Sequence, residues 1–150
     1  MANATSTQLQ ELYVAYFGRP ADPIGLDYWE EKGVSQRYFA STMHAQPEFQ
    51  DAYGSSNTEN QVNQIYRNLF NREADASGLA YWTNPINKDV LQLAEIATHL
   101  IWAAKNNSGS ADDLTALNNR SSAALAYTAE VKASIDCISA YQPTSIDPWI

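Results

Sequence analysis

Two pairs of oppositely charged residues recur at one spacing and could form a ligand-binding turn. Arg19 stands three positions before Asp22, and Arg72 stands three positions before Asp75. Side chains of both signs offer hydrogen-bond donors and acceptors to a polar ligand. The same residue types also suit a helix cap with a local ion pair that fixes a turn. We expect this structural role, in which the arginines fix the turn and the aspartates cap a helix.

Tyrosine–tryptophan pairs beside these turns could stack on sugar rings. Tyr28 with Trp29, and Tyr81 with Trp82, occupy equivalent positions. Repeated aromatic residues at helical spacing are more often part of a hydrophobic core. We therefore expect Trp29 and Trp82 to be buried, and sugar stacking is the alternative if they lie on the surface.

Metal binding at the first turn has little support. Asp22, Gly25 and Asp27 resemble part of a calcium loop, but the alternating oxygen ligands and final Glu of an EF-hand are missing. The second copy has Ala80 where the first has Asp27. Gly25 and Gly78 could admit a glycan to the backbone, although close helix packing explains them without a ligand. We expect no cofactor and no metal ligands, with calcium left as an open alternative.

Catalytic constellations are also missing from the sequence. His44 and His99 have no second His or Cys at zinc-ligand spacing. Cys137 is the single cysteine, so no disulfide can form within the chain, and no basic neighbour activates its thiol. Neither a nucleophile elbow nor a glycine-rich phosphate loop occurs. We expect a protein that is not an enzyme.

The repeated candidates belong to an internal repeat. Residues 5–29 align with residues 58–82 at a constant offset of 53, without a gap. Eleven of the 25 positions are identical, rare residues among them, so chance is a poor explanation. The residues that define the motif are Tyr13, Phe17, Arg19, Asp22, Gly25, Leu26 and Trp29 in the first copy, and Tyr66, Phe70, Arg72, Asp75, Gly78, Leu79 and Trp82 in the second.

Each copy predicts a helix, a tight turn and a second helix. Apolar residues at i, i+3, i+4, i+7 and i+8 form one stripe along the first helix. Glycine at position 18 and asparagine at position 71 end the stripes, and both tolerate the left-handed conformation that follows a helix. The expected capping boxes are Thr5 with Gln8 and Thr58 with Gln61.

The remaining sequence also predicts helices. Residues 38–43 and 48–53 form short ones, and Asn87 caps a run that continues to Ile101. Ser110 with Asp113 resembles a capping box for a long final helix over about 111–140. The apolar stripe of that helix is Leu114, Leu117, Ser121, Leu125, Thr128, Val131, Ile135 and Ile138. The fold is therefore expected to be all-α, with about seven helices in one domain over 1–142 and a tail or linker over 143–150.

Composition restricts the classes of partner. The chain has 150 residues, is 45% hydrophobic and carries a net charge of −8. This acidity argues against a nucleic-acid partner, which requires clustered Lys and Arg. It also argues against electrostatic docking on anionic lipid. No stretch of the sequence is long and apolar enough to predict a membrane span.

The two motif copies resemble the signature of a bacterial domain-of-unknown-function family. The shared pattern is Tyr-x3-Phe-(Gly/Asn)-Arg-x2-Asp-x2-Gly-Leu-x-Tyr-Trp, from Tyr13 to Trp29 and from Tyr66 to Trp82. The segment from Leu117 through Thr128 also resembles the C-terminal part of that family, so the resemblance covers about residues 5–138. The family occurs in secreted and cell-surface proteins, including S-layer and RTX (haemolysin-like) proteins exported by type I systems.

The resemblance implies a function outside the cell. The arrangement is similar to the helical anchoring region of some S-layer proteins, which implies a non-catalytic surface module of a Gram-negative bacterium that binds lipopolysaccharide or another surface polysaccharide. In such proteins calcium is often required for the outer lattice. The first six residues lack the features of a signal peptide, which fits type I substrates because their signal is C-terminal. The alternative is a structural assembly module that contacts itself, the rest of the same protein or another protein. The first motif also resembles phycobilisome linker domains, which are helical scaffolds, at the level of the fold.

Overall fold

The computed structural model describes the backbone of residues 2–107 and 111–141, and their side chains up to residue 135. These ranges contain no strand, which confirms the expected all-α class. The eight helices found there are close to the expected number of about seven. They are α1 (Ser6–Phe17), α2 (Pro23–Lys32), α3 (Gln36–His44), α4 (Pro47–Tyr53), α5 (Thr58–Phe70), α6 (Ala76–Asn87), α7 (Leu93–Asn106) and α8 (Ala111–Tyr141).

The two repeat copies adopt the same succession of helix, turn and helix. α1 and α5 both end in a left-handed residue, Gly18 with φ 66° and Asn71 with φ 56°. Both following helices, α2 and α6, are capped by the expected aspartates, Asp22 and Asp75. The expected turn chemistry is therefore present in both copies.

The two expected capping boxes have different outcomes. Thr5 and Gln8 form the predicted box at the start of α1. The second box is wrong by one residue, because Thr58 is already helical and Asn57 caps α5. The Asn57 Oδ1 accepts the backbone N–H of residue 60 at 2.8 Å. Gln61 instead donates to the backbone oxygen of Tyr53 at 2.6 Å.

The expected helix from Asn87 to Ile101 begins later than predicted. Asn87 is the last residue of α6, and α7 begins at Leu93. Between them Asp89 adopts a left-handed conformation with φ 56°, which the periodicity of the apolar residues does not reveal. Ser110, the expected cap of the final helix, lies outside the described residues.

Helix α1 lies at the centre of the helical assembly. It packs against α2, α3, α4, α5, α7 and α8, so every residue from Leu9 to Tyr16 is buried. The sequence predicts only one apolar stripe, yet Gln10 and Glu11 are buried as well. Glu11 lies against Lys105 of α7, with 2.8 Å between its Oε1 and the lysine Nζ.

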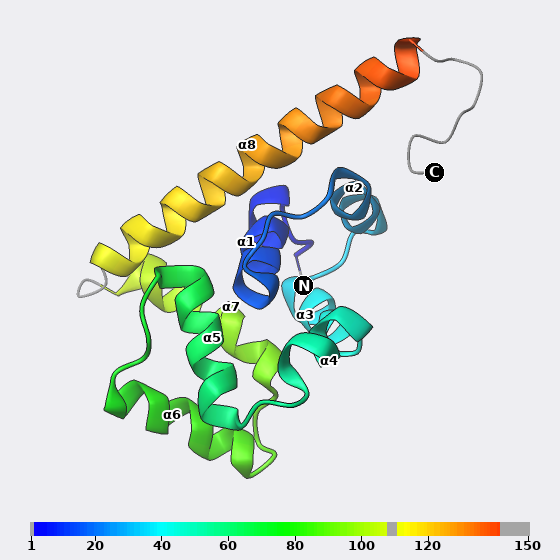
Figure 1. The fold of residues 1–150 in the computed structure, drawn as a ribbon. Coiled ribbons are helices and arrows are strands. Elements are labelled where there is room, and N and C mark those ends of the chain that lie inside the picture. The colour runs from blue at the N-terminus through cyan, green and yellow to red at the C-terminus, as the bar shows by residue number, and fades with distance from the viewer. Residues whose placement is uncertain (1, 108–110, 142–150) are drawn as a thin grey trace.

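The long helix α8 lies across α1, α5 and α7 and reaches α2 (Figure 1). Leu117, Ser121 and Thr128 of the predicted stripe are buried, together with Ala124 rather than Leu125. The Thr128 hydroxyl donates to the backbone oxygen of residue 21 at 2.6 Å and accepts from Gln10 at 3.0 Å. This buried network fixes α8 against the first turn. No helix in the described ranges has the length and apolarity needed to cross a membrane.

Candidate functional site: the duplicated turn and its hollow

The first turn is held by Arg19, which reaches a helix outside the motif. Its Nη1 donates to the backbone oxygen of Pro20 at 3.1 Å. Its Nε and Nη2 donate to the Glu48 carboxylate of α4, at 3.0 Å and 2.7 Å from Oε1. The arginine fixes the turn, as expected, but the expected ion pair with Asp22 is wrong. The reason is that Asp22 is committed to its helix cap, whereas the fold brings Glu48 to the guanidinium.

The second turn repeats this arrangement with a different acidic partner. Arg72 donates to the backbone oxygen of Glu73 at 3.0 Å and to the two carboxylate oxygens of Asp113 at 2.8 Å each. Asp113 belongs to the first turn of α8, so this arginine joins the second motif to the long helix. Hydrogen bonding to Asp113 raises the pKa of Arg72 above its ordinary value. The expected pairing with Asp75 is wrong for the same reason as in the first copy.

Both guanidinium groups also lie over aromatic rings of the motif. Arg19 is 5.9 Å from the ring centre of Tyr13 and 5.4 Å from that of Phe17. The corresponding distances from Arg72 are 5.3 Å to Tyr66 and 5.9 Å to Phe70. Cation–π attraction therefore adds to the ion pair in holding each turn to the helix that precedes it.

The aspartates of the motif act as caps. Asp22 accepts the backbone N–H of Gly25 at 2.7 Å, and Asp75 accepts that of Gly78 at 2.7 Å. Asp75 also accepts the hydroxyl of Ser77 at 3.0 Å. The hydrogen bonds from Gly78 and then Ser77 lower the pKa of the Asp75 carboxyl. These carboxylates are thus structural groups of the turn.

The repeated glycines permit close contact with the first helix of each copy. A Cβ at Gly25 would lie 3.2 Å from the Tyr13 hydroxyl, and one at Gly78 would lie 3.4 Å from that of Tyr66. Burial raises the pKa of both tyrosines, although hydrogen bonding from the neighbouring tryptophan opposes this shift. Helix packing therefore accounts for these glycines without a glycan at the backbone.

The two tryptophans differ in burial. Trp29 is 8% exposed and packs edge-to-face on Phe39 of α3, with 5.2 Å between ring centres. Trp82 is only partly buried; its indole donates to Tyr66 at 3.1 Å and its ring lies 5.8 Å from that of the exposed His99. The expectation of burial is thus met fully in the first copy and partly in the second. The two tryptophans differ because of the residue that covers each one. Trp29 is covered by the buried Phe39 of α3, whereas Trp82 is covered by the exposed His99 of α7.

The repeated tyrosines lie on the surface in both copies. Tyr28 is 53% exposed and Tyr81 is 69% exposed. Each is perpendicular to the neighbouring tryptophan, with ring centres 5.0 Å apart for the first pair and 4.8 Å for the second. Aromatic surface therefore remains open at the second helix of each motif.

A hollow of about 500 Å³ lies beside the first copy. The Lys32 side chain is one of its lining residues, and its ammonium lies 5.6 Å from the ring centre of Tyr28 and 5.4 Å from that of Trp29. A hydrogen bond to Tyr28 raises the pKa of Lys32 above its ordinary value. The hollow is lined by Tyr13, Phe17, Arg19, Asp22, Tyr28, Trp29, Lys32, Thr42, Met43, Gln46, Pro47 and Glu48.

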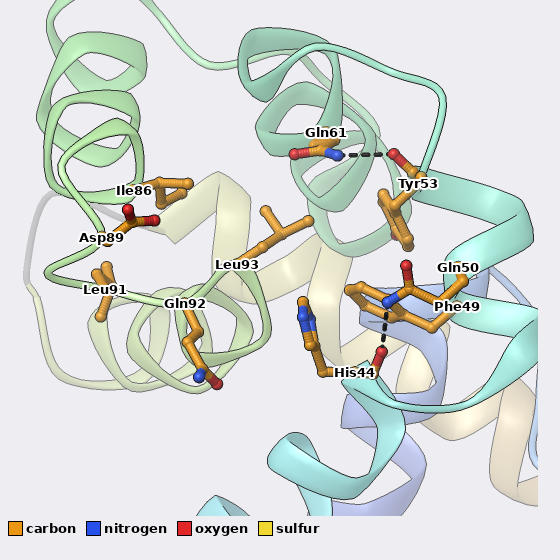
Figure 2. A pocket seen from close by; sticks show the side chains of 11 residues that line it. His44, Phe49, Gln50, Tyr53, Gln61, Ile86, Asp89, Leu91, Gln92 and Leu93 are labelled. Carbon is orange, nitrogen blue, oxygen red and sulfur yellow. Dashed lines mark hydrogen bonds between the residues drawn. The ribbon is translucent and has the colours of Figure 1, made fainter.

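A second hollow, of about 380 Å³, lies where α3 and α4 meet the connection between α6 and α7 (Figure 2). Two of its polar side chains are committed to the backbone, since Gln50 donates to the oxygen of His44 and Gln61 to that of Tyr53. The His44 Nδ1 is buried and has no hydrogen-bond partner among the described residues. The rings of Phe49 and Tyr53 are almost fully buried, so this hollow offers a ligand little aromatic surface.

Metal-binding side chains do not gather in the described part of the chain. No group of three or more His, Cys, Asp or Glu residues that could hold an ion occurs there. His44 lines the second hollow and His99 lies on Trp82. The side chain of Cys137 lies outside the described residues.

Sequence reasoning missed several residues of this site. Glu48 and Asp113, the partners of the two arginines, are 29 and 41 positions away from them, and no local signal links the pairs. Lys32 is detectable in principle, because it follows Tyr28 by one helical turn on α2.

Comparison with known proteins gives one match. Residues 40–108 match a family described as a domain of unknown function (DUF4214). The matched segment runs from α3 to the end of α7, so it contains the second motif copy and excludes the first. No curated protein and no solved structure matches the chain. The match supports the resemblance to a domain-of-unknown-function family over that segment.

Proposed function

We propose that this chain is a non-catalytic anchoring module that attaches a secreted, S-layer-like protein to the lipopolysaccharide of a bacterial outer membrane. The observation that carries the proposal is the hollow beside the first motif copy. There the exposed Tyr28 lines the hollow with Trp29, Lys32 and Gln46, and the Lys32 ammonium lies over both aromatic rings. Carbohydrate sites combine such aromatic surface with a few well-placed polar groups.

The charge of the chain agrees with a hydroxyl-rich partner. Five of the nine Lys and Arg side chains are engaged in ion pairs, and the net charge is −8. A polyanion such as nucleic acid is therefore a poor partner. A sugar chain needs hydrogen-bond donors and acceptors rather than a basic patch. The resemblance of the motif to surface and type I secreted proteins supplies the setting at the cell surface.

A second candidate function is a structural assembly module. It is favoured by Trp102 of α7, which is 63% exposed, and by Tyr127 of α8, which is 58% exposed. Large aromatic residues on a surface are typical of contacts between proteins. This candidate predicts binding that does not depend on polysaccharide.

The experiment compares bacterial cells with and without the polysaccharide chain of their lipopolysaccharide. Cells stripped of their native surface layer are incubated with the purified chain, and bound protein is measured, with and without calcium. We expect binding only where the polysaccharide is present, and binding to purified lipopolysaccharide. Equal binding to both cell types, or binding to neither, would show that the anchoring proposal is wrong and would favour the assembly module.

A matched pair of variants tests the hollow itself. Lys32→Ala removes the ammonium from the hollow, whereas Lys88→Ala removes an exposed ammonium at the end of α6. Loss of a charged hydrogen bond should weaken binding of purified lipopolysaccharide about tenfold for Lys32→Ala. Lys88→Ala should bind like the unaltered chain. Equal affinities for the two variants would remove the hollow from the proposal.

A further inference from the structure

Tyr28 and Tyr81 are identical in the two copies although neither is buried and neither caps a helix. The other identical residues are buried or partly buried, cap a helix, hold the turn or hydrogen-bond to a neighbouring segment. These two tyrosines are instead more than half exposed. The Tyr28 hydroxyl meets the Lys32 ammonium at 3.4 Å, but the equivalent position beside Tyr81 is Pro85. The hydroxyl contact is therefore not what the copies share.

What the copies share is the aromatic geometry. Tyr28 meets Trp29 at an interplanar angle of 82°, and Tyr81 meets Trp82 at 89°. Each tyrosine ring thus leaves accessible surface to solvent while the tryptophan fixes its orientation. The face of such a ring is apolar and electron-rich, which suits the C–H groups of a sugar ring. Because Lys32 is replaced by Pro85 in the second copy, the feature common to both is an aromatic ring that suits an uncharged sugar ring.

We propose that the chain carries two sugar-stacking sites related by the repeat, at Tyr28 on α2 and at Tyr81 on α6, which make it bivalent for a polysaccharide surface. This inference rests on the proposed function and adds the number and place of its contacts. The helices α2 and α6 lie far apart in the fold (Figure 1), so one sugar unit cannot occupy both sites. A duplicated site suits a polysaccharide, because its sugar units repeat along the chain. Once one site is bound, the second binds at a high local ligand concentration, so two weak contacts together give tight binding to a dense surface.

The test measures how many oligosaccharides one chain binds, and it compares binding of the free oligosaccharide with binding to immobilised lipopolysaccharide. A single-repeat oligosaccharide released from purified lipopolysaccharide is titrated into the chain by calorimetry. We expect two oligosaccharides per unaltered chain, one for Tyr28→Ala and one for Tyr81→Ala. On immobilised lipopolysaccharide each single variant should bind roughly 100-fold more weakly, because avidity is lost. Phenylalanine at either position should preserve binding, since the ring is retained.

The control is Tyr127→Ala, which removes a tyrosine of similar exposure that lies outside the motif. This variant should bind like the unaltered chain, and thermal melts should show all variants folded. If the chain binds lipopolysaccharide but takes up one oligosaccharide, or if either tyrosine variant binds normally, bivalency is wrong and anchoring survives. If the unaltered chain binds no lipopolysaccharide, both proposals fail.

Discussion

Replacement of Trp29 by alanine measures how far the first motif copy supports the fold. Its side chain is 8% exposed and packs on Phe39, so removal leaves a cavity between α2 and α3. Emptying a buried aromatic site costs roughly 3–5 kcal/mol of unfolding free energy. At roughly 2–4 °C per kcal/mol for a chain of this size, the melting temperature should fall by about 6–20 °C.

Two other tryptophans provide a graded comparison for this measurement. Trp82→Ala should cost less, about 1–3 kcal/mol, because the ring is only partly buried and the main loss is its hydrogen bond to Tyr66. Trp102→Ala should change stability by no more than about 0.5 kcal/mol, because that side chain is 63% exposed. Urea titrations and thermal melts give the order. If Trp29→Ala is no more destabilising than Trp102→Ala, Trp29 is not a core residue and the burial argument for the motif fails.

Three further predictions concern the turn and its contact with α8. Gly25→Ala should cost about 1–3 kcal/mol in urea titration and more than Gly78→Ala, because the added Cβ would lie 2.9 Å rather than 3.1 Å from the cap carboxylate; equal costs would contradict this. Hydrogen bonding lowers the pKa of Asp75 in the folded chain. Its cap therefore stabilises the fold at a pH above about 4, the ordinary carboxyl pKa, and this stabilisation is lost as the pH falls through the lower pKa of the folded state. Asp75→Asn, which caps without titrating, should therefore reduce the fall in melting temperature below about pH 4, and an unchanged fall would refute the assignment. Thr128→Val leaves two buried polar groups unpaired and should cost about 1–3 kcal/mol, whereas Thr115→Val on the exposed face of α8 should cost clearly less.

The sequence by itself determined the repeat, its helices and most of its turn chemistry. Asp22 and Asp75 cap their helices, and Gly18 and Asn71 end the preceding ones, because these roles depend on neighbours within a few residues. At the start of α5 the sequence offers two adjacent polar residues that could cap the helix. The prediction was Thr58, but Asn57 is the cap. Such a boundary depends on where the preceding segment enters the helix, and both side chains satisfy the local rule.

Only the tertiary structure decided which surfaces remain open. The motif places Trp29 and Trp82 identically, yet α3 covers the first with Phe39 while the second meets the exposed His99. The partners of Arg19 and Arg72 likewise come from α4 and α8, distant segments with no repeat relation to each other. Burial and ion pairing depend on elements far away in the chain, so an internal repeat determines local conformation without determining what covers it. The exposure of Tyr28 and Tyr81 is a product of that packing.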